Sequence, residues 1–173
     1  MNFLDYSNIE TPRLTLRLIN KDHEALVYKL RSNPEVCKYI ARPLFVTPDE
    51  AKEQVEKVLG FMAENESITW VLGLKNSSIE IGTICLWNFS KDRKTAEVGY
   101  DSLPEYQGHG YMTEALEAVI DFGFKTLNLK TIEAFTSKRN LSSIKLLQKQ
   151  NFKLQTHRLD PENAENNIYC LTI

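Results

Sequence analysis

The sequence predicts a single α/β domain built on a mixed, mostly antiparallel sheet of six to seven strands with about four helices. A chain of 173 residues suits one sizeable core, so we expect one domain over residues 1–173. Between residues 68 and 102, three strand-like runs joined by short polar turns predict an antiparallel meander. Between residues 94 and 135, a strand, a helix and a strand follow one another, which is typical of a parallel crossover unit.

The first part of the chain predicts one strand and two helices before the meander. Residues 14–18 alternate between apolar and polar side chains, as a half-buried strand does. Residues 21–31 have the pattern of a short helix, which we expect to end near Asn33-Pro34. A capping box with proline at the first helical position, Thr47-Pro48-Asp49-Glu50, predicts the start of a longer helix. The apolar face of that helix comprises Ala51, Val55, Val58, Leu59 and Met62.

The remaining elements follow in the second part of the chain. The meander strands are expected at residues 68–74, 79–89 and 94–102. Apolar side chains at helical spacing then extend from Met112 to Phe124, and a strand is expected at residues 131–135. Another helix is expected from Asn140, and two short strands at residues 152–154 and 168–173 close the chain.

The loop between the third meander strand and the next helix predicts an anion site. Gly108 and Gly110 lead directly into the apolar stripe of the helix. The first amides of a helix have no partners within it, the helix dipole adds roughly half a positive charge, and glycines allow a phosphate to approach closely. A P-loop is excluded because the chain contains no Gly-Lys pair, and the dinucleotide fingerprint fails because Thr113 takes the place of its third glycine.

Composition is that of a globular protein and argues against several functional classes. The apolar fraction is 42% and the charged fraction 25%, so disorder is not expected. The net charge of −2 argues against a general nucleic-acid-binding surface. Three distant cysteines and three scattered histidines show no disulfide framework and no zinc-ligand spacing, so we expect no metal. Without a signal-like amino terminus or an apolar run of membrane length, we expect a cytoplasmic location and no membrane contact.

Four segments, spread in order over nearly the whole chain, carry a family resemblance. They are residues 11–17 (TPRLTLR), 97–100 (EVGY), 104–116 (PEYQGHGYMTEAL) and 140–143 (NLSS). Together they resemble the GNAT superfamily of acyl-CoA-dependent N-acyltransferases, and within it the branch of ribosomal-protein N-terminal acetyltransferases. The acetyl-CoA loop of that superfamily reads Gln/Arg-x-x-Gly-x-Gly/Ala, and residues 107–112 of this chain read Gln-Gly-His-Gly-Tyr-Met.

Three positions depart from the usual pattern of the superfamily. Met112 stands where the loop usually ends in a small residue, and Asn151-Phe152 stands where Gly-Phe is usual. Leu147 stands where many members have a tyrosine that is thought to protonate the leaving thiolate. The last departure occurs across the branch, so it bears on the identity of the acid more than on the activity.

The resemblance implies that the loop binds acetyl-CoA through its backbone. The amides from Gly108 to Thr113 would hold the pyrophosphate, and Gln107 would reach a phosphate or the adenine end. The side chains of His109 and Tyr111 would point outward. Met112 would be tolerated because the ligand uses amides there, and its side chain would fit the buried stripe of the helix.

The resemblance also implies a V-shaped splay between the two strands that flank the loop. Backbone groups exposed in the splay can pair with the pantetheine amides of the cofactor, as an added strand would. Ser102 and Leu103 are the candidates for these contacts. Pro104 is consistent with this geometry, because proline lacks the donor that would continue the ladder.

The resemblance also suggests residues for the chemistry, in which a neutral amine attacks acetyl-CoA directly and no cysteine nucleophile is needed. Asn140 is an expected N-cap that would also contact the pantetheine arm near the thiol. Ser143 could donate a proton or a hydrogen bond to the departing thiolate. Glu97 is the candidate base acting through water, with Glu162 and then Glu165 as competitors.

The resemblance implies that the acceptor is a primary amine and, within the branch, a protein or peptide N-terminal α-amine. An α-amine has a pKa of about 7.7–8.0, and a lysine or polyamine amine near 10.4 costs roughly 4 kcal/mol more to deprotonate at neutral pH. The absence of an obvious strong base in the sequence therefore fits an α-amine. The alternatives are a polyamine or aminoglycoside acceptor, and a CoA-binding sensor that has lost turnover. The superfamily commonly dimerises, so edge-strand ends could pair in a homodimer.

Overall fold

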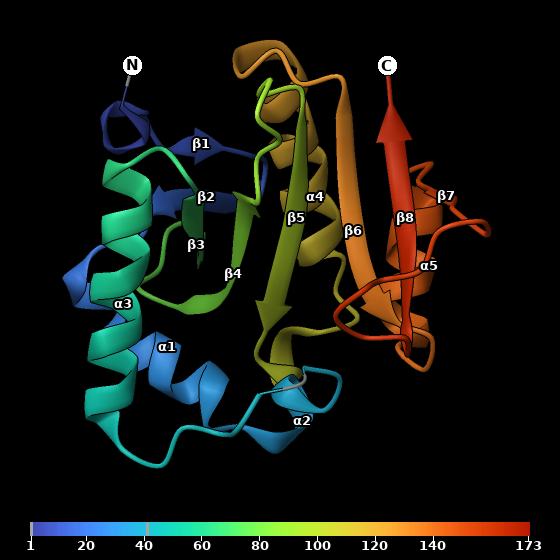
Figure 1. Ribbon diagram of the computed structural model, residues 1–173. Coiled ribbons are helices and arrows are strands. Elements are labelled where there is room, and N and C mark those ends of the chain that lie inside the picture. The colour runs from blue at the N-terminus through green and yellow to red at the C-terminus, as the bar shows by residue number, and fades with distance from the viewer. Residues whose placement is uncertain (1, 41) are drawn as a thin grey trace.

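An eight-stranded sheet forms the centre of the molecule, with its strands in the order β1-β2-β3-β4-β5-β6-β8-β7 (Figure 1). This computed structural model describes residues 2–40 and 42–173. The strands are β1 (Ile9–Glu10), β2 (Leu14–Leu18), β3 (Ile68–Leu74), β4 (Glu80–Trp87), β5 (Thr95–Ser102), β6 (Thr131–Ser137), β7 (Lys153–Leu154) and β8 (Asn166–Thr172). The predicted α/β class with a mixed, mostly antiparallel sheet is confirmed. The prediction missed β1, because a two-residue strand is too short to show an alternating pattern.

Five α-helices lie in the described residues, where about four were predicted. They are α1 (Glu24–Arg31), α2 (Pro34–Cys37), α3 (Pro48–Ala63), α4 (Tyr111–Asp121) and α5 (Leu141–Lys149). The additional helix is α2, because the Asn33 side chain accepts hydrogen bonds from the amides of Glu35 and Val36 and so starts a new turn where α1 ends. The capping box predicted at Thr47 and Glu50 is confirmed at the start of α3. None of the described helices is long and apolar enough to cross a membrane.

The helices divide between the two faces of the sheet. In Figure 1, α1, α2 and α3 lie in front of the sheet, and α4 and α5 lie behind it. Arg31 of α1 approaches Asp101 of β5 on the front face (3.9 Å), whereas Ser143 of α5 hydrogen-bonds Tyr100 of β5 on the back face (2.8 Å). Successive side chains of a strand point to opposite faces, so β5 contributes side chains to both the front face and the back face.

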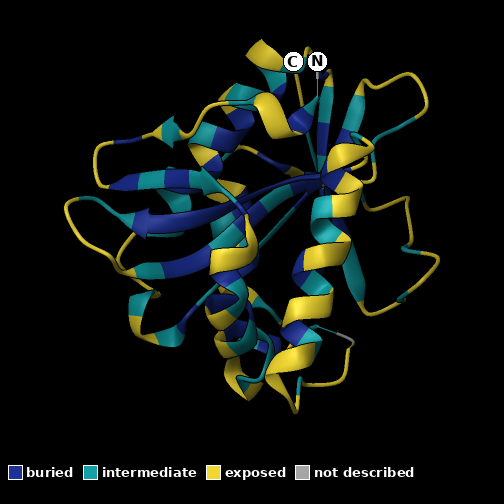
Figure 2. Ribbon diagram, turned by 90° about the vertical axis from the view of Figure 1, so that its left-hand side faces the viewer, coloured by how far each residue is buried: buried dark blue, intermediate teal, exposed yellow. Residues whose placement is uncertain are grey.

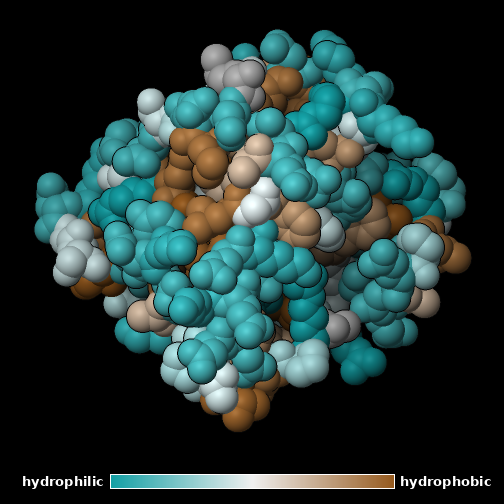
Figure 3. Space-filling model, turned by 60° about the vertical axis from the view of Figure 1, so that its left-hand side comes forward, coloured by the Kyte–Doolittle hydropathy of each residue, from teal (hydrophilic) through white to brown (hydrophobic). Residues whose placement is uncertain are grey.

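The core gathers around the central strands. Trp70, Val71 and Leu72 of β3 have no exposed surface. Figure 2 shows the central strands buried while the outer sides of the helices are exposed. Figure 3 shows a surface that is mostly hydrophilic, with hydrophobic patches between the polar side chains. A close-packed core of this kind gives the strand ends a rigid base, which a functional site needs.

The predicted meander and the predicted crossover are both confirmed. β3, β4 and β5 pair antiparallel in succession, and β5, α4 and β6 form the crossover with parallel strands. The pairing of β5 with β6 ends at Glu97 opposite Glu133, after only three residue pairs. Beyond that pair the two strands separate, which confirms the V-shaped splay. The splay opens toward the carboxyl ends of the strands, where ligands bind in open α/β sheets.

Candidate functional site

A loop with two left-handed residues joins the carboxyl end of β5 to α4. Gly108 and Gly110 have φ angles of 78° and 80°, a region that residues with side chains rarely adopt. Gly110 is the N-cap of α4, and no side chain caps the helix. The glycines therefore turn the chain into the helix while leaving the helix start free of a side-chain cap.

Six consecutive amides of this loop have no acceptor within the described part of the protein. The amide of Gln107 donates to Pro104 (3.1 Å) and the amide of Glu114 donates to Gly110 (3.1 Å). Between them, the amides of residues 108–113 donate to no described backbone or side-chain acceptor. Unpaired amides seek an acceptor, and the helix dipole adds roughly half a positive charge at this end of α4. The loop is therefore suited to bind a phosphate or pyrophosphate group.

Three contacts occupy side chains of the loop. The side-chain nitrogen Nε2 of Gln107 donates to the carbonyl of Ser102 (3.0 Å). This hydrogen bond connects the loop to the end of β5, so the Gln107 side chain does not extend toward a phosphate. The rings of His109 and Tyr111 stack on each other, with centroids 5.9 Å apart. Met112 packs against the hydrophobic core. Anion binding at this loop would therefore rest on the backbone.

The register of β5 decides which of its backbone groups face the splay. The amide of Leu103 donates to Ile81 (2.8 Å) and its carbonyl accepts from Tyr106 (3.0 Å), so both groups already have partners outside the splay. Bonded groups alternate along an antiparallel ladder, so the backbone groups of Tyr100 and Ser102 point toward β6. The Ser102 carbonyl already accepts from the Gln107 side chain, so the structure keeps the Ser102 amide as a candidate for pantetheine contacts. It does not bring Leu103 into the splay, and it adds Tyr100.

Two hydroxyl groups meet on the back face of the splay. Tyr100 Oη and Ser143 Oγ lie 2.8 Å apart, and Ser143 is only 8% exposed. Burial raises the pKa of Tyr100 to about 12, although the hydrogen bond to Ser143 opposes the rise, so the phenol stays protonated at neutral pH. If Tyr100 donates to Ser143, the hydroxyl hydrogen of Ser143 is free for another acceptor.

Asn140 lies beside Ser143 as the N-cap of α5. Its Oδ1 accepts from the Ser143 amide (3.2 Å) and from the Ser142 hydroxyl (2.9 Å). Its Nδ2 has no acceptor among the described residues and remains able to donate. Leu147, on the same helix, is fully buried in the core cluster and offers no polar group. The hydroxyl available at this end of the splay is thus that of Ser143 or Tyr100, not one from position 147.

Glu97 lies on the opposite, front face of β5. Its Oε1 accepts a hydrogen bond from the side chain of Asn88, which follows β4. Burial raises the pKa of Glu97, the Asn88 hydrogen bond opposes the rise, and the charges of Glu133, Asp160 and Glu162 add to it. A carboxylate with a raised pKa is better matched to base catalysis near neutral pH than an ordinary glutamate.

The two competing carboxylates lie in the loop between β7 and β8. Glu165 pairs with Arg139 (3.6 Å) and helps to line a pocket of about 360 Å³ with Tyr39, which follows α2. Glu162 is exposed, and its amide donates to Asp160 (2.9 Å). Neither carboxylate is placed on β5 as Glu97 is, so Glu97 is the candidate that belongs to the strand beside the splay.

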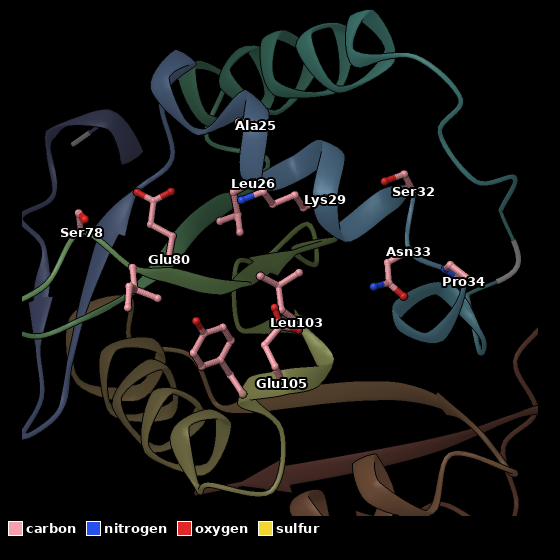
Figure 4. Close-up of a pocket in the computed structure, with 12 residues that line it drawn as sticks. Ala25, Leu26, Lys29, Ser32, Asn33, Pro34, Ser78, Glu80, Leu103 and Glu105 are labelled. Atoms are coloured by element: carbon pink, nitrogen blue, oxygen red, sulfur yellow. The ribbon is translucent and has the colours of Figure 1, made fainter.

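A larger pocket, of about 740 Å³, lies close to the loop. Figure 4 shows its lining, with Ala25 and Lys29 of α1 on one side and Leu103 and Glu105 on the other. Glu80, at the start of β4, also lines it. The pocket therefore opens on the β4 side of β5, whereas the splay opens on the β6 side.

The three cysteines of the chain are free thiols. Burial raises the pKa of Cys85 to about 12 and that of Cys170 to about 11, and it also raises the pKa of Cys37. These thiols therefore stay protonated at neutral pH, in the form that is not nucleophilic. Within residues 2–40 and 42–173, no group of three or more histidine, cysteine, aspartate or glutamate side chains could hold a metal ion.

Comparison with known proteins identifies the family. Residues 13–153 match the family model described as an acetyltransferase (GNAT) domain, which is most of the chain. The chain belongs to the GNAT acetyltransferases. The resemblance to the GNAT superfamily is thereby confirmed, and with it an acetyl-CoA-dependent acyltransferase activity. GNAT acetyltransferases use acetyl-CoA, a cosubstrate that carries a pyrophosphate.

Relatives of this GNAT chain act on different amines. It is 30% identical to the uncharacterized N-acetyltransferase p20 of Bacillus licheniformis, over 91% of this chain and 89% of that protein. It is 25% identical to the spermidine N(1)-acetyltransferase of Escherichia coli, over 81% and 73%. The ribosomal-protein-S5-alanine acetyltransferase of Vibrio fischeri shares the fold, with a TM-score of 0.81, 24% identity and coverage of 96% and 97%. These comparisons leave the acceptor open.

Three residues join the site that the sequence did not single out. Tyr100 and Arg13 belong to the segments EVGY and TPRLTLR, but their roles depend on contacts with residues far along the chain. Asn88 itself has a φ of 47°, a conformation that asparagine tolerates, and its side chain donates to Glu97. A single asparagine after a strand gives no signal of this kind in the sequence.

Proposed function

We propose that this GNAT enzyme acetylates a protein or peptide N-terminal α-amine by direct attack within a ternary complex. The observation that carries the proposal is the division of polar groups across β5. Glu97 lies on the front face, whereas the pair of Tyr100 and Ser143 lies on the back face. Direct transfer needs a base at the amine and a hydrogen-bond donor at the sulfur. Glu97 would supply the base on the front face, and Ser143 with Tyr100 would supply the donor on the back face.

The cofactor would lie along the loop and within the splay. The free amides of residues 108–113 would hold the pyrophosphate. The pantetheine arm would pair with the outward backbone groups of Tyr100 and with the amide of Ser102, as an added strand does. The free Nδ2 of Asn140 would donate to the arm near the thiol. The thioester would then lie between Ser143 and the front face.

The chemistry would proceed in one displacement. Glu97, through a water molecule, accepts the proton of the amine as its nitrogen attacks the acetyl carbonyl. The new C–N bond forms, the C–S bond breaks, and the thiolate accepts a hydrogen bond from Ser143 before it takes up a proton and leaves as CoA. A thiol has a pKa of about 8.5, so its thiolate is a fair leaving group and a weak donor suffices. The protonated state of Cys85 and Cys170 supports transfer without a cysteine intermediate.

The basicity of the acceptor favours an α-amine. With a pKa of about 7.7–8.0, a sizeable fraction of an α-amine is neutral near pH 7.5, whereas an amine near 10.4 is almost wholly charged. One glutamate with a moderately raised pKa is therefore sufficient for an N-terminus. The shared fold with the ribosomal-protein-S5-alanine acetyltransferase is consistent with this acceptor at the level of the fold.

A polyamine is the second candidate acceptor. Glu133, Asp160 and Glu162 lie near enough to Glu97 to raise its pKa, and negative charge on this face attracts a polycation. Arg158 forms an ion pair with Glu133 and so removes part of that charge. Sequence similarity to the spermidine N(1)-acetyltransferase covers 81% of this chain at 25% identity, so a polyamine is included among the acceptors to be tested.

An acceptor screen decides between these candidates. Peptides with free alanine, serine or methionine N-termini would be compared with the same peptides blocked by N-acetylation, and with spermidine, spermine and an aminoglycoside. We expect thiol release with the free peptides at a kcat/KM about tenfold or more above that for the polyamines, and none with blocked peptides. Faster turnover of polyamines would reject the α-amine proposal. Acetyl-CoA binding with no thiol release from any amine would indicate a sensor.

The oligomeric state and location remain separate proposals. Both edges of the sheet, β1 and β7, are two residues long, so pairing of strand edges across a homodimer would be short. We infer a cytoplasmic enzyme that forms a homodimer through other surfaces or through such short edges. Sedimentation of the purified protein as a monomer at micromolar concentration would reject the homodimer.

A further inference from the structure

The segment TPRLTLR places a residue behind the acetyl-CoA loop, about a hundred residues away along the chain. Thr11 and Arg13 precede β2, and both contact the first turns of α4. The Thr11 hydroxyl donates to Glu114 Oε1 (2.7 Å), and the backbone amide of Arg13 donates to the same oxygen (2.7 Å). The Arg13 Nε donates to Glu114 Oε2 (2.7 Å). Glu114 is thus held by three donors from one turn.

The guanidinium of Arg13 continues from Glu114 to the loop itself. Its Nη1 donates to the carbonyl of His109 (3.0 Å), and the group lies 4.7 Å from the centre of the Tyr111 ring. A Cβ built on Gly110 would lie 3.4 Å from its Nη2. Arg13 therefore contacts the loop at His109 and Tyr111 and lies beside Gly110 between them.

This contact orients the peptide plane between His109 and Gly110. In a trans peptide the carbonyl and the following N–H point in opposite directions. Because the carbonyl of His109 points to Arg13, the amide of Gly110 points away from Arg13. That amide is one of the six without an acceptor in the described protein. Arg13 thus aims a free amide at the place where the anion would lie.

The charges of the pair support a positioning role. Glu114 lies in the first turn of α4, where an unpaired carboxylate would repel a bound pyrophosphate. The ion pair with Arg13 offsets that charge, and the hydrogen bond between Arg13 Nε and Glu114 Oε2 is charge-assisted. Burial opposes ionisation of Glu114, but the hydrogen bonds from Thr11 and Arg13 prevail and hold its pKa below the ordinary value. Glu114 is therefore ionised at neutral pH.

We propose that Arg13 and Glu114 are positioning residues that hold the loop in its pyrophosphate-binding conformation before the cofactor arrives. Preorganisation of this kind lowers the cost of binding without adding a contact to the ligand. The proposal gives a task to the segment TPRLTLR, and it does not depend on which amine is the acceptor. It predicts that the pair affects cofactors with a pyrophosphate and spares those without one.

The test compares a donor that has the pyrophosphate with one that lacks it. In Arg13→Gln we expect the Kd for CoA and the KM for acetyl-CoA to rise about tenfold, with kcat changed less than about twofold. With S-acetylpantetheine, which has no pyrophosphate, KM should stay within about twofold of the wild-type value. Arg13→Lys should recover part of the loss, because an ammonium can reach either Glu114 or His109 but not both. The double variant Arg13→Gln/Glu114→Gln should lose less than the sum of the single variants.

Arg17 offers a matched control on the next strand. It is an arginine of β2 with similar exposure, paired with Glu80 (3.7 Å) and without a contact to the loop among the described residues. Arg17→Gln should leave CoA binding unchanged. Unaltered CoA affinity in Arg13→Gln would overturn the proposal. So would an equal loss of CoA and pantetheine binding, or a fall in kcat alone, because either result would locate the effect in the fold or in the chemistry.

Discussion

The two sides of the splay are built in different ways. On the side proposed to hold acetyl-CoA, the loop of residues 107–113 is one continuous segment whose free groups are backbone amides, and two glycines turn the chain so that these amides stay unpaired. On the acceptor side, Glu97 takes its properties from Asn88, Glu133 and the loop after β7, which come together only in the folded protein. A site made of backbone can be recognised from a short motif, whereas a site made of side chains on separate elements cannot.

A substitution at Gly110 should have the largest effect and should act on the donor side alone. In Gly110→Val we expect CoA affinity to fall by tenfold or more, because a β-branched residue does not adopt a φ of 80° and the loop must turn its amides away. The folded state should be little changed, because the loop is exposed. Calorimetric titration with CoA measures the loss.

A glycine elsewhere provides the control for this substitution. A Cβ on Gly60, within α3, would meet nothing within 4 Å, so Gly60→Ala should keep both the fold and CoA affinity. If Gly110→Val bound CoA as tightly as the wild-type protein, the phosphate would not be held by this loop. The description of the cofactor side as a backbone site would then be wrong.

The order of elements was predictable because each strand and helix has a local pattern. The alternation in β2, the capping box of α3 and the glycine start of α4 each act within a few residues. The two missed elements, β1 and α2, are two and four residues long, which is too short for a period to show.

The candidate site was predictable to the extent that it is backbone. The free amides of residues 108–113 follow from the position of the glycines. Leu103 stays a predicted contact of the cofactor, but only the register of β5 against β4 reveals that its amide already donates to Ile81. The Tyr100 hydroxyl could not be assigned to Ser143, since the contact joins residues 43 positions apart. Side-chain partners of this kind depend on tertiary packing, which no short pattern encodes.

The hydroxyl pair of the back face should have an intermediate effect, limited to the chemical step. In Ser143→Ala we expect kcat to fall about tenfold, because the departing thiolate loses a hydrogen bond. In Tyr100→Phe we expect a smaller fall, of a few fold, because the ring remains and only the group that orients Ser143 is lost. The Kd for CoA should be nearly unchanged in both variants.

The double variant separates a joint role from two separate ones. If Tyr100 acts through Ser143, then Tyr100→Phe/Ser143→Ala should be no slower than Ser143→Ala alone. Additive losses would show that the phenol acts on its own, as a donor to the thiolate or as a packing residue. A loss of CoA affinity that matched the loss of kcat would instead assign the pair to cofactor binding.

The smallest effect is expected at Asn88, and it tests the acceptor side through pH. The carboxylate of Glu97 is the active form of the proposed base, so kcat should fall as pH drops through its pKa, which burial places above that of an ordinary glutamate. Asn88 donates to this carboxylate and so lowers its pKa. Removing the donor in Asn88→Gly, which accepts the φ of 47°, should raise the pKa and move the acidic limb of kcat to higher pH. Activity on the acidic limb should therefore fall, whereas activity on the plateau at higher pH should change little.

Two further variants serve as controls for the shift of the acidic limb. Asn76→Gly, at another turn residue with a φ of 58°, should leave the profile unchanged, because that side chain makes no contact with Glu97. Glu97→Gln should remove the limb, since the titrating group is gone. If the limb persisted in Glu97→Gln, the titration would belong to another group, with Glu162 and the amine itself as the remaining candidates. A limb that vanished in Glu97→Gln but did not move in Asn88→Gly would keep Glu97 as the base and show that burial and neighbouring charge, not the Asn88 hydrogen bond, set its pKa.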